Sequence, residues 1–81
     1  MKISVETIKY SGSIERDELL PNCSVNRHEV CSMIKNNNEI ISCTLDDQGF
    51  FLWIEIDATS ELSIEQIKNL IKQAMHKYLK P

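Results

Sequence analysis

The chain has 81 residues, of which 42% are hydrophobic and 26% are charged, and its formal net charge at pH 7 is −3. This length leaves no room for a second domain, so we expect residues 1–81 to form a single small domain with one core. The acidic balance argues against non-specific nucleic-acid binding, which needs a positive surface, and the recurring apolar segments exclude a disordered chain.

Residues 2–10 predict a β-strand, because polar and apolar side chains alternate along much of this segment. Ser11-Gly12-Ser13 is typical of a turn. The stretch that continues to residue 27 leaves two alternatives open. It is either a short helix over Ile14–Leu20, capped by Ser13 and stopped by Pro21, or an irregular loop.

Three further strands are expected to follow as an antiparallel meander. Residues 28–35 and 39–46 form the first two, joined by a hairpin turn at Asn36-Asn37-Asn38, since asparagine tolerates positive φ. Residues 50–57 are the strongest strand and follow a turn that ends at Gly49. The expected apolar faces of the last two strands are formed by Ile41, Cys43 and Leu45, and by Phe50, Leu52, Ile54 and Ile56.

Residues 63–79 predict an amphipathic helix. Ser63 and Gln66 have the spacing of a capping box. Apolar side chains then recur every three or four positions, at Ile64, Ile67, Ile71, Ala74 and Tyr78. The sequence therefore predicts an α+β fold in β-(α)-β-β-β-α order, in which this C-terminal helix packs on one face of an antiparallel sheet of three to four strands.

Cysteine and histidine side chains are the only candidates for metal or nucleophilic chemistry. Cys23, His28, Cys31 and Cys43 follow a spacing that matches no zinc module, and in a strand His28 and Cys31 would point to opposite faces. No oxyanion motif or orienting carboxylate accompanies Cys31 and His28. We therefore expect three free thiols, no metal, no cofactor and no catalytic residues, so that the protein is not an enzyme.

The strand at 50–57 also predicts a contact surface. If its aliphatic side chains face the helix, Phe51 and Trp53 point the other way, and Ile40 and Met33 are expected to join them. Two interpretations stay open: residues 11–27 cover these side chains as part of the core, or the four residues form an exposed patch that binds a protein partner or a second copy.

A row of basic side chains follows the solvent face of the predicted C-terminal helix at intervals of four residues. Its members are Lys68, Lys72, His76 and Lys80. One interpretation is a site for phosphate or an acidic partner, and the other is a solvated face whose cations match the helix dipole.

The order of helix, three strands and helix from Ser13 to Leu79 resembles the layout of double-stranded RNA-binding domains. That family implies a basic start to the last helix, where this chain has the acidic run SELSIE at residues 60–65. The last three strands and helix also resemble sheet-in-groove DNA-binding domains, such as integrase arm-binding domains, which imply a basic sheet face. Here that face would carry Ser42, Thr44, Glu55 and Asp57, so neither family is assigned.

These patterns favour a small accessory or regulatory protein that acts by binding another protein, alone or as a homodimer. The alternative is a nucleic-acid-binding module that uses the basic row. An odd number of cysteines, an N-terminus unlike a signal peptide and no long apolar run predict a cytoplasmic protein without a membrane segment.

Overall fold

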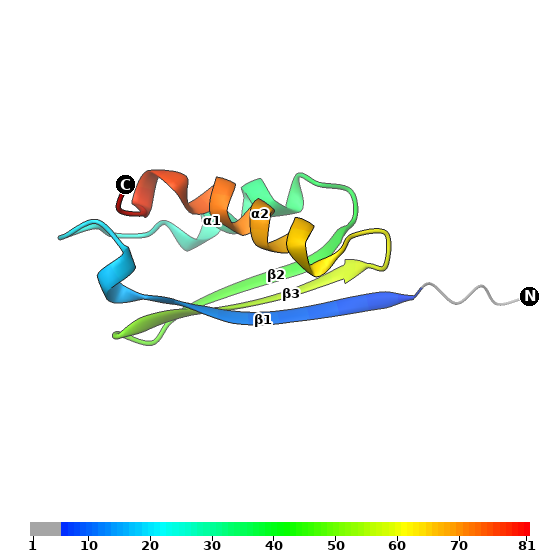
Figure 1. The fold of residues 1–81 in the computed structure, drawn as a ribbon, viewed down its shortest axis with the longest axis horizontal. Helices are drawn as coiled ribbons and strands as arrows, with labels where there is room; N and C mark the ends of the chain where they lie inside the picture. The colour runs from blue at the N-terminus through cyan, green and yellow to red at the C-terminus, as the bar shows by residue number, and fades with distance from the viewer. Residues whose placement is uncertain (1–5) are drawn as a thin grey trace, which may run out of the picture.

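The computed structural model describes residues 6–81 as an α+β fold (Figure 1). Within this range, three strands form one antiparallel sheet in the order β1-β3-β2, with bounds of Thr7–Glu15 for β1, Ile40–Asp47 for β2 and Phe51–Thr59 for β3. Two α-helices, α1 (Arg27–Lys35) and α2 (Ile64–Met75), lie on the same side of the sheet. The first residues of the strand predicted at 2–10 fall outside the described range, and only its second half can be compared.

Strand β1 (Thr7–Glu15) is longer than predicted at its C-terminal end. The turn expected at Ser11-Gly12-Ser13 is wrong, because these residues pair with Glu55, Ile54 and Trp53 in the middle of the strand. Gly12 is required by side-chain packing, because a Cβ at this position would lie 2.5 Å from the Tyr10 hydroxyl. The glycine therefore leaves space for the tyrosine ring beside it in the strand.

The helix expected over Ile14–Leu20 is also wrong. Ile14 belongs to β1, and the segment contains only the short 3-10 helix η1 (Arg16–Glu18). Leu19 is fully buried and bridges to Leu79, so the chain crosses to the side of the sheet that carries the helices. The segment after β1 therefore packs against the end of the C-terminal helix and leaves the opposite sheet face uncovered.

Helix α1 (Arg27–Lys35) replaces the strand predicted at 28–35. Val30 and Ile34 are both buried, and their spacing of four fits one face of a helix as well as one face of a strand. The deciding signal is Asn26, whose side chain accepts a hydrogen bond from the backbone N–H of Glu29 at 3.0 Å and caps the helix. Because α1 stands where a strand was expected, the three consecutive strands on which both family resemblances depended are not formed by residues 28–57.

Strand β2 (Ile40–Asp47) follows a loop at residues 36–39 that joins it to α1, so the predicted hairpin turn at 36–38 is wrong. A bulge between Ile40 and Ser42 changes the side-chain phase of the strand. Ile40 is consequently buried in the core, and Ile41, which was expected there, is exposed. Beyond the bulge, Leu45 faces the core as predicted.

Strand β3 (Phe51–Thr59) is the central strand, and its helix-facing side chains Leu52, Ile54 and Ile56 are buried as predicted. Phe50 is the exception. It belongs to the turn before the strand and is 86% exposed, so its assignment to the core is wrong. The turn that was expected to end at Gly49 is present, and Gly49 has a φ of +94°, a left-handed conformation that glycine adopts without strain.

Helix α2 (Ile64–Met75) continues as the 3-10 helix η2 (His76–Tyr78), close to the predicted bounds. The capping box is confirmed: Ser63 Oγ accepts from the Gln66 N–H at 3.2 Å, and Gln66 Oε1 accepts from the Ser63 N–H at 2.8 Å. Ile67 and Ile71 are buried in the core that α2 shares with α1 and the sheet, whereas Ile64 is 38% exposed and lies outside the core.

Candidate functional site

The sheet has one face that neither helix covers, which we call the outer face. Side chains alternate along the paired strands, so the outer face is formed by every second residue. These residues are Thr7, Lys9, Ser11, Ser13 and Glu15 of β1, Ser42, Thr44 and Asp46 of β2, and Phe51, Trp53, Glu55, Asp57 and Thr59 of β3. The face is therefore polar over most of its length and aromatic at one end.

Phe51 and Trp53 form the aromatic end of this face, and we call them the aromatic patch. Phe51 lies opposite Glu15, and Trp53 lies between Ser13 and Asp46 on the two neighbouring strands. Trp53 is 37% exposed, and its indole N–H donates to Glu55 Oε1 at 3.0 Å. This bond satisfies the polar atom of the ring, so the remaining exposed surface of Trp53 is apolar and available for contact.

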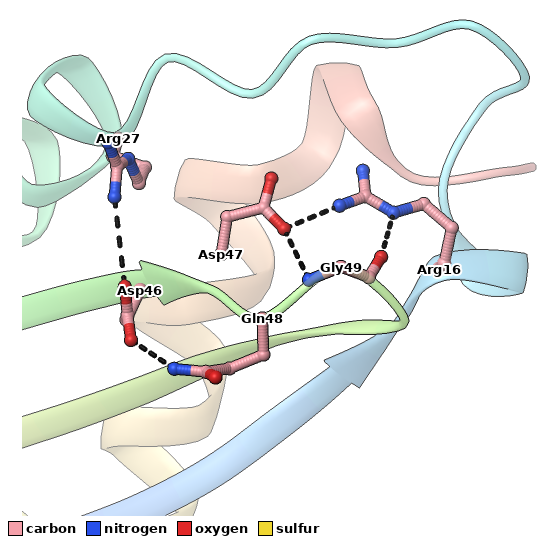
Figure 2. Close-up of polar contacts among 6 residues, drawn as sticks. All are labelled: Arg16, Arg27, Asp46, Asp47, Gln48 and Gly49. Atoms are coloured by element: carbon pink, nitrogen blue, oxygen red, sulfur yellow. Dashed lines mark hydrogen bonds and ion pairs between the residues drawn. The ribbon is translucent and has the colours of Figure 1, made fainter.

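The patch follows a hairpin that is held in place by Arg16 (Figure 2). Arg16 Nη2 donates to Asp47 Oδ1 at 2.8 Å, and Arg16 Nε donates to the carbonyl oxygen of Gly49 at 3.0 Å. The backbone N–H of Gly49 also donates to Asp47 Oδ1, at 2.9 Å. We call these three residues the hairpin clamp, because they join the end of β1 to the turn between β2 and β3.

The clamp also changes the acidity of Asp47. The hydrogen bond from the Gly49 N–H, followed by the hydrogen bond from Arg16, stabilises the carboxylate and lowers the pKa of Asp47 below its ordinary value of 3.8. Asp47 is therefore ionised at neutral pH, which keeps the clamp closed. Arg16 carried no recognisable motif in the sequence, since its partners lie more than thirty residues away along the chain.

Negative charge surrounds the aromatic patch. The strand residues of the outer face carry four carboxylates, at Glu15, Asp46, Glu55 and Asp57, and one ammonium group, at Lys9. Lys9 lies 3.9 Å from Asp57, which also accepts from the Ser42 hydroxyl at 3.2 Å. A shallow polar depression of about 190 Å³ is centred on this group. The strand residues of the outer face therefore carry more negative than positive charge.

The structure separates the other two residues of the predicted patch from Phe51 and Trp53. Ile40 is buried in the core on the helix-facing side of the sheet, because of the bulge in β2. Met33 is exposed, but it lies on α1, in the layer on the other side of the sheet. Only Phe51 and Trp53 are therefore brought together on the outer face.

The predicted basic row is interrupted by the end of α2. Lys68 and Lys72 lie one turn apart on α2 and line a groove between this helix and β1. His76 belongs to η2, and Lys80 follows it, where the Lys80 backbone N–H donates to the carbonyl oxygen of Glu18 at 2.9 Å. All four side chains are exposed, but they do not continue one regular helical row.

Helix α1 brings His28 and Cys31 to one side, which corrects the expectation that they point to opposite faces. Together with Cys43 of β2 they line an open groove between α1 and the sheet. The thiols of Cys31 and Cys43 lie 3.3 Å apart, and burial together with the hydrogen bond to Cys31 raises the pKa of Cys43 to about 12. The Cys43 thiol is therefore protonated at neutral pH and is a poor nucleophile.

Among residues 6–81, no group of three or more His, Cys, Asp or Glu side chains is arranged to hold a metal ion. No helix in the same range is long and apolar enough to cross a membrane. Comparison with known proteins gives no family: no family model, no curated protein and no solved structure matches the chain.

Proposed function

We propose that this protein is a small accessory module that binds another protein through the outer face of its sheet, with the aromatic patch as the anchor. The observation that carries the proposal is the arrangement of the two layers. In the part of the chain that the structure describes, both α-helices and the segment after β1 lie on one side of the sheet. Trp53 lies on the other side, where its side chain is 37% exposed.

The chemistry of the outer face defines the kind of partner. Large aromatic side chains at the centre of a contact, surrounded by polar groups, are typical of protein interfaces, and tryptophan is enriched among residues that contribute most to affinity. The carboxylates of Glu15, Asp46 and Glu55 lie next to the aromatic patch and form its acidic border. We therefore propose a partner that offers an apolar pocket bordered by lysine or arginine, with an arginine able to stack on the Trp53 ring.

A binding role is favoured over a catalytic one by the state of the Cys43 thiol. His28, Cys31 and Cys43 are the nucleophilic and basic side chains that share a groove, and the raised pKa of Cys43 keeps that thiol neutral. The three free cysteines suit a reducing compartment, so we propose the cytoplasm as the location.

The proposal is tested by capture from an extract of the native host with immobilised wild-type chain, Trp53→Ser and Met33→Ser, followed by mass spectrometry. Met33→Ser is the matched control, because it removes an exposed apolar side chain from the opposite layer. We expect one protein to be retained by the wild type and by Met33→Ser and lost with Trp53→Ser. Equal recovery with all three chains would contradict the proposal.

The alternative function, nucleic-acid binding by Lys68 and Lys72, gives a different result in the same experiment. Capture would then weaken steeply as salt is added and would disappear after nuclease treatment, while Trp53→Ser would leave it unchanged. Binding through the aromatic patch falls less steeply with salt, because salt screens the charges at its border but not the burial of apolar surface.

A further inference from the structure

Strand β1 leaves one edge of the sheet unpaired in the described part of the chain, because the strand order is β1-β3-β2. Next to β1, the backbone N–H of Arg16 donates to the Phe50 carbonyl oxygen, and the N–H of Ser60 donates to the carbonyl oxygen of Glu6. Even-numbered residues of β1 therefore bond to β3. By the antiparallel alternation, the N–H and C=O groups of Lys9, Ser11 and Ser13 point to the free edge.

An exposed edge of this length is a ready template for another strand, and β1 has few of the features that protect edges. Within Thr7–Glu15 it contains no proline and no bulge, and it pairs with β3 without a register shift. A groove of about 210 Å³ runs between the strand and α2, and its apolar lining includes Tyr10, Ile14, Ile71 and Met75. A strand added at the edge would cover the half-buried side chains of Tyr10 and Ile14.

We propose that β1 pairs with β1 of a second copy of this chain, antiparallel, about a two-fold axis at Gly12. This register is self-complementary. It places Lys9 opposite Glu15 of the second copy on the outer face, and it places Tyr10 opposite Ile14 of the second copy on the helix-facing side. Each contact occurs twice, because the interface is the same surface on both chains.

The backbone pattern fits the same register. Two pairs of positions lie directly opposite each other, Lys9 with Glu15 and Ser11 with Ser13, and their unpaired backbone N–H and C=O groups point across the interface. Gly12 lies opposite Gly12 of the second copy at a non-hydrogen-bonded position, where the two strands are closer. Tyr10 already lies over Gly12 in its own strand, so the space above the two glycines is filled. The N–H of Glu15 is held by the Glu18 carboxylate at 2.8 Å, so Glu15 contributes its carbonyl oxygen.

The neighbouring register about Ser11 lacks this match. An axis at Ser11 places Lys9 opposite Ser13 and Glu15 opposite Thr7, so that neither charge meets an opposite charge. Lys68 and Lys72, at the border of the groove, approach the second copy, and their long flexible side chains let the ammonium groups turn to water. The dimer joins two sheets into one with both aromatic patches on the same side, and it uses a surface separate from the proposed partner site.

The test exchanges the two charges. Lys9→Glu alone places two glutamates opposite each other, and Glu15→Lys alone places two lysines opposite each other. Mixing the two variants pairs opposite charges at both contacts of a mixed dimer. We expect the wild type to sediment as a dimer, each variant alone to associate about tenfold more weakly or worse, and the equimolar mixture to return to near the wild-type dissociation constant.

Two controls keep the test sharp. Lys35→Glu makes the same change of net charge on α1, which packs over β2 at the other edge of the sheet, and should leave dimerisation unchanged. Ser11→Pro removes an N–H that points to the free edge and should abolish the dimer while the melting curve stays cooperative. A wild-type chain that is monomeric up to about 1 mM, or a mixture no stronger than the single variants, would overturn the proposal.

Discussion

Arg16 and Asp47 are joined side chain to side chain, with Arg16 Nη2 donating to Asp47 Oδ1 at 2.8 Å. Arg16 lies at the start of the segment after β1, and Asp47 is the last residue of β2. The bond therefore joins the segment after β1 to the β2–β3 hairpin. Because Phe51 and Trp53 follow this hairpin directly, the clamp determines how firmly the aromatic patch is presented.

We predict that Arg16→Ala loosens the hairpin without unfolding the chain. The side chains of Arg16 and Asp47 are both partly exposed, and their contact contributes less to stability than a buried contact does. The amide of Gly49 should exchange with solvent severalfold faster, while amides in the middle of β3 keep their protection. Hydrogen exchange followed by NMR measures the exchange rate of each amide.

The control variant Arg16→Lys keeps the charge but loses the two-point contact, and should resemble Arg16→Ala. Wild-type exchange at Gly49 in both variants would show that the clamp is not needed.

Acid should open the same clamp. The pKa of Asp47 is lower in the folded chain than its ordinary value of 3.8, so the carboxylate contributes stability at pH values above 3.8. That contribution is lost as pH falls below 3.8 and through the lowered pKa. We expect the wild-type melting midpoint to fall over this range more than that of Asp47→Asn, whose side chain has no proton to gain. Identical pH dependence of the two chains would contradict the proposed role of the carboxylate.

The elements that were predicted correctly are those whose local signals agree. Ser63 and Gln66 cap α2, and the alternation in β3 places Leu52 and Trp53 on opposite faces. The apolar pattern does not distinguish helix from strand at α1, because Val30 and Ile34 fit either period, and the capping residue Asn26 is the local signal that favours the helix. Continuation of β1 through Gly12 depends on its pairing with β3, which a turn-like local sequence does not reveal.

The candidate site divides in the same way. The orientation of Phe51 and Trp53 follows from a period of two within a single strand, and could be predicted. The removal of Ile40 from the patch required the bulge in β2, which depends on how that strand meets β3. The hairpin clamp and the free edge of β1 depend on contacts between distant segments, so no local pattern of residues could have indicated them.

Core and surface positions on α2 should respond differently to the same substitution. Ile67 is fully buried, and Ile67→Ala should lower the free energy of unfolding by about 2–5 kcal/mol, as truncation of a buried isoleucine does. Ile64 is 38% exposed at the first turn, and Ile64→Ala should cost less than about 1 kcal/mol. Urea denaturation of the two variants measures the difference. Equal losses of unfolding free energy in the two variants would show that Ile67 does not belong to the buried face of α2.

The Cys43 thiol should be slow to react and should make stability depend on alkaline pH. Burial and the neighbouring Cys31 thiol raise its pKa from 9.0 to about 12, which favours the neutral form in the folded chain. The contribution of this group to stability is therefore complete below pH 9.0 and is lost as pH rises toward about 12. We expect thermal melting of the wild type to fall more steeply over this range than that of Cys43→Ala. Rapid labelling of Cys43 by a thiol reagent at neutral pH would contradict the assignment.

The contact role of Trp53 is tested most directly by the affinity of the captured partner, after purification, for the wild-type chain and for Trp53→Ser. We predict that Trp53→Ser binds about thirtyfold more weakly or worse, as loss of a central interface tryptophan does, while its melting midpoint stays close to that of the wild type. Met33→Ser should bind like the wild type. Equal affinity of Trp53→Ser and the wild type for the partner would contradict the outer face as the binding surface.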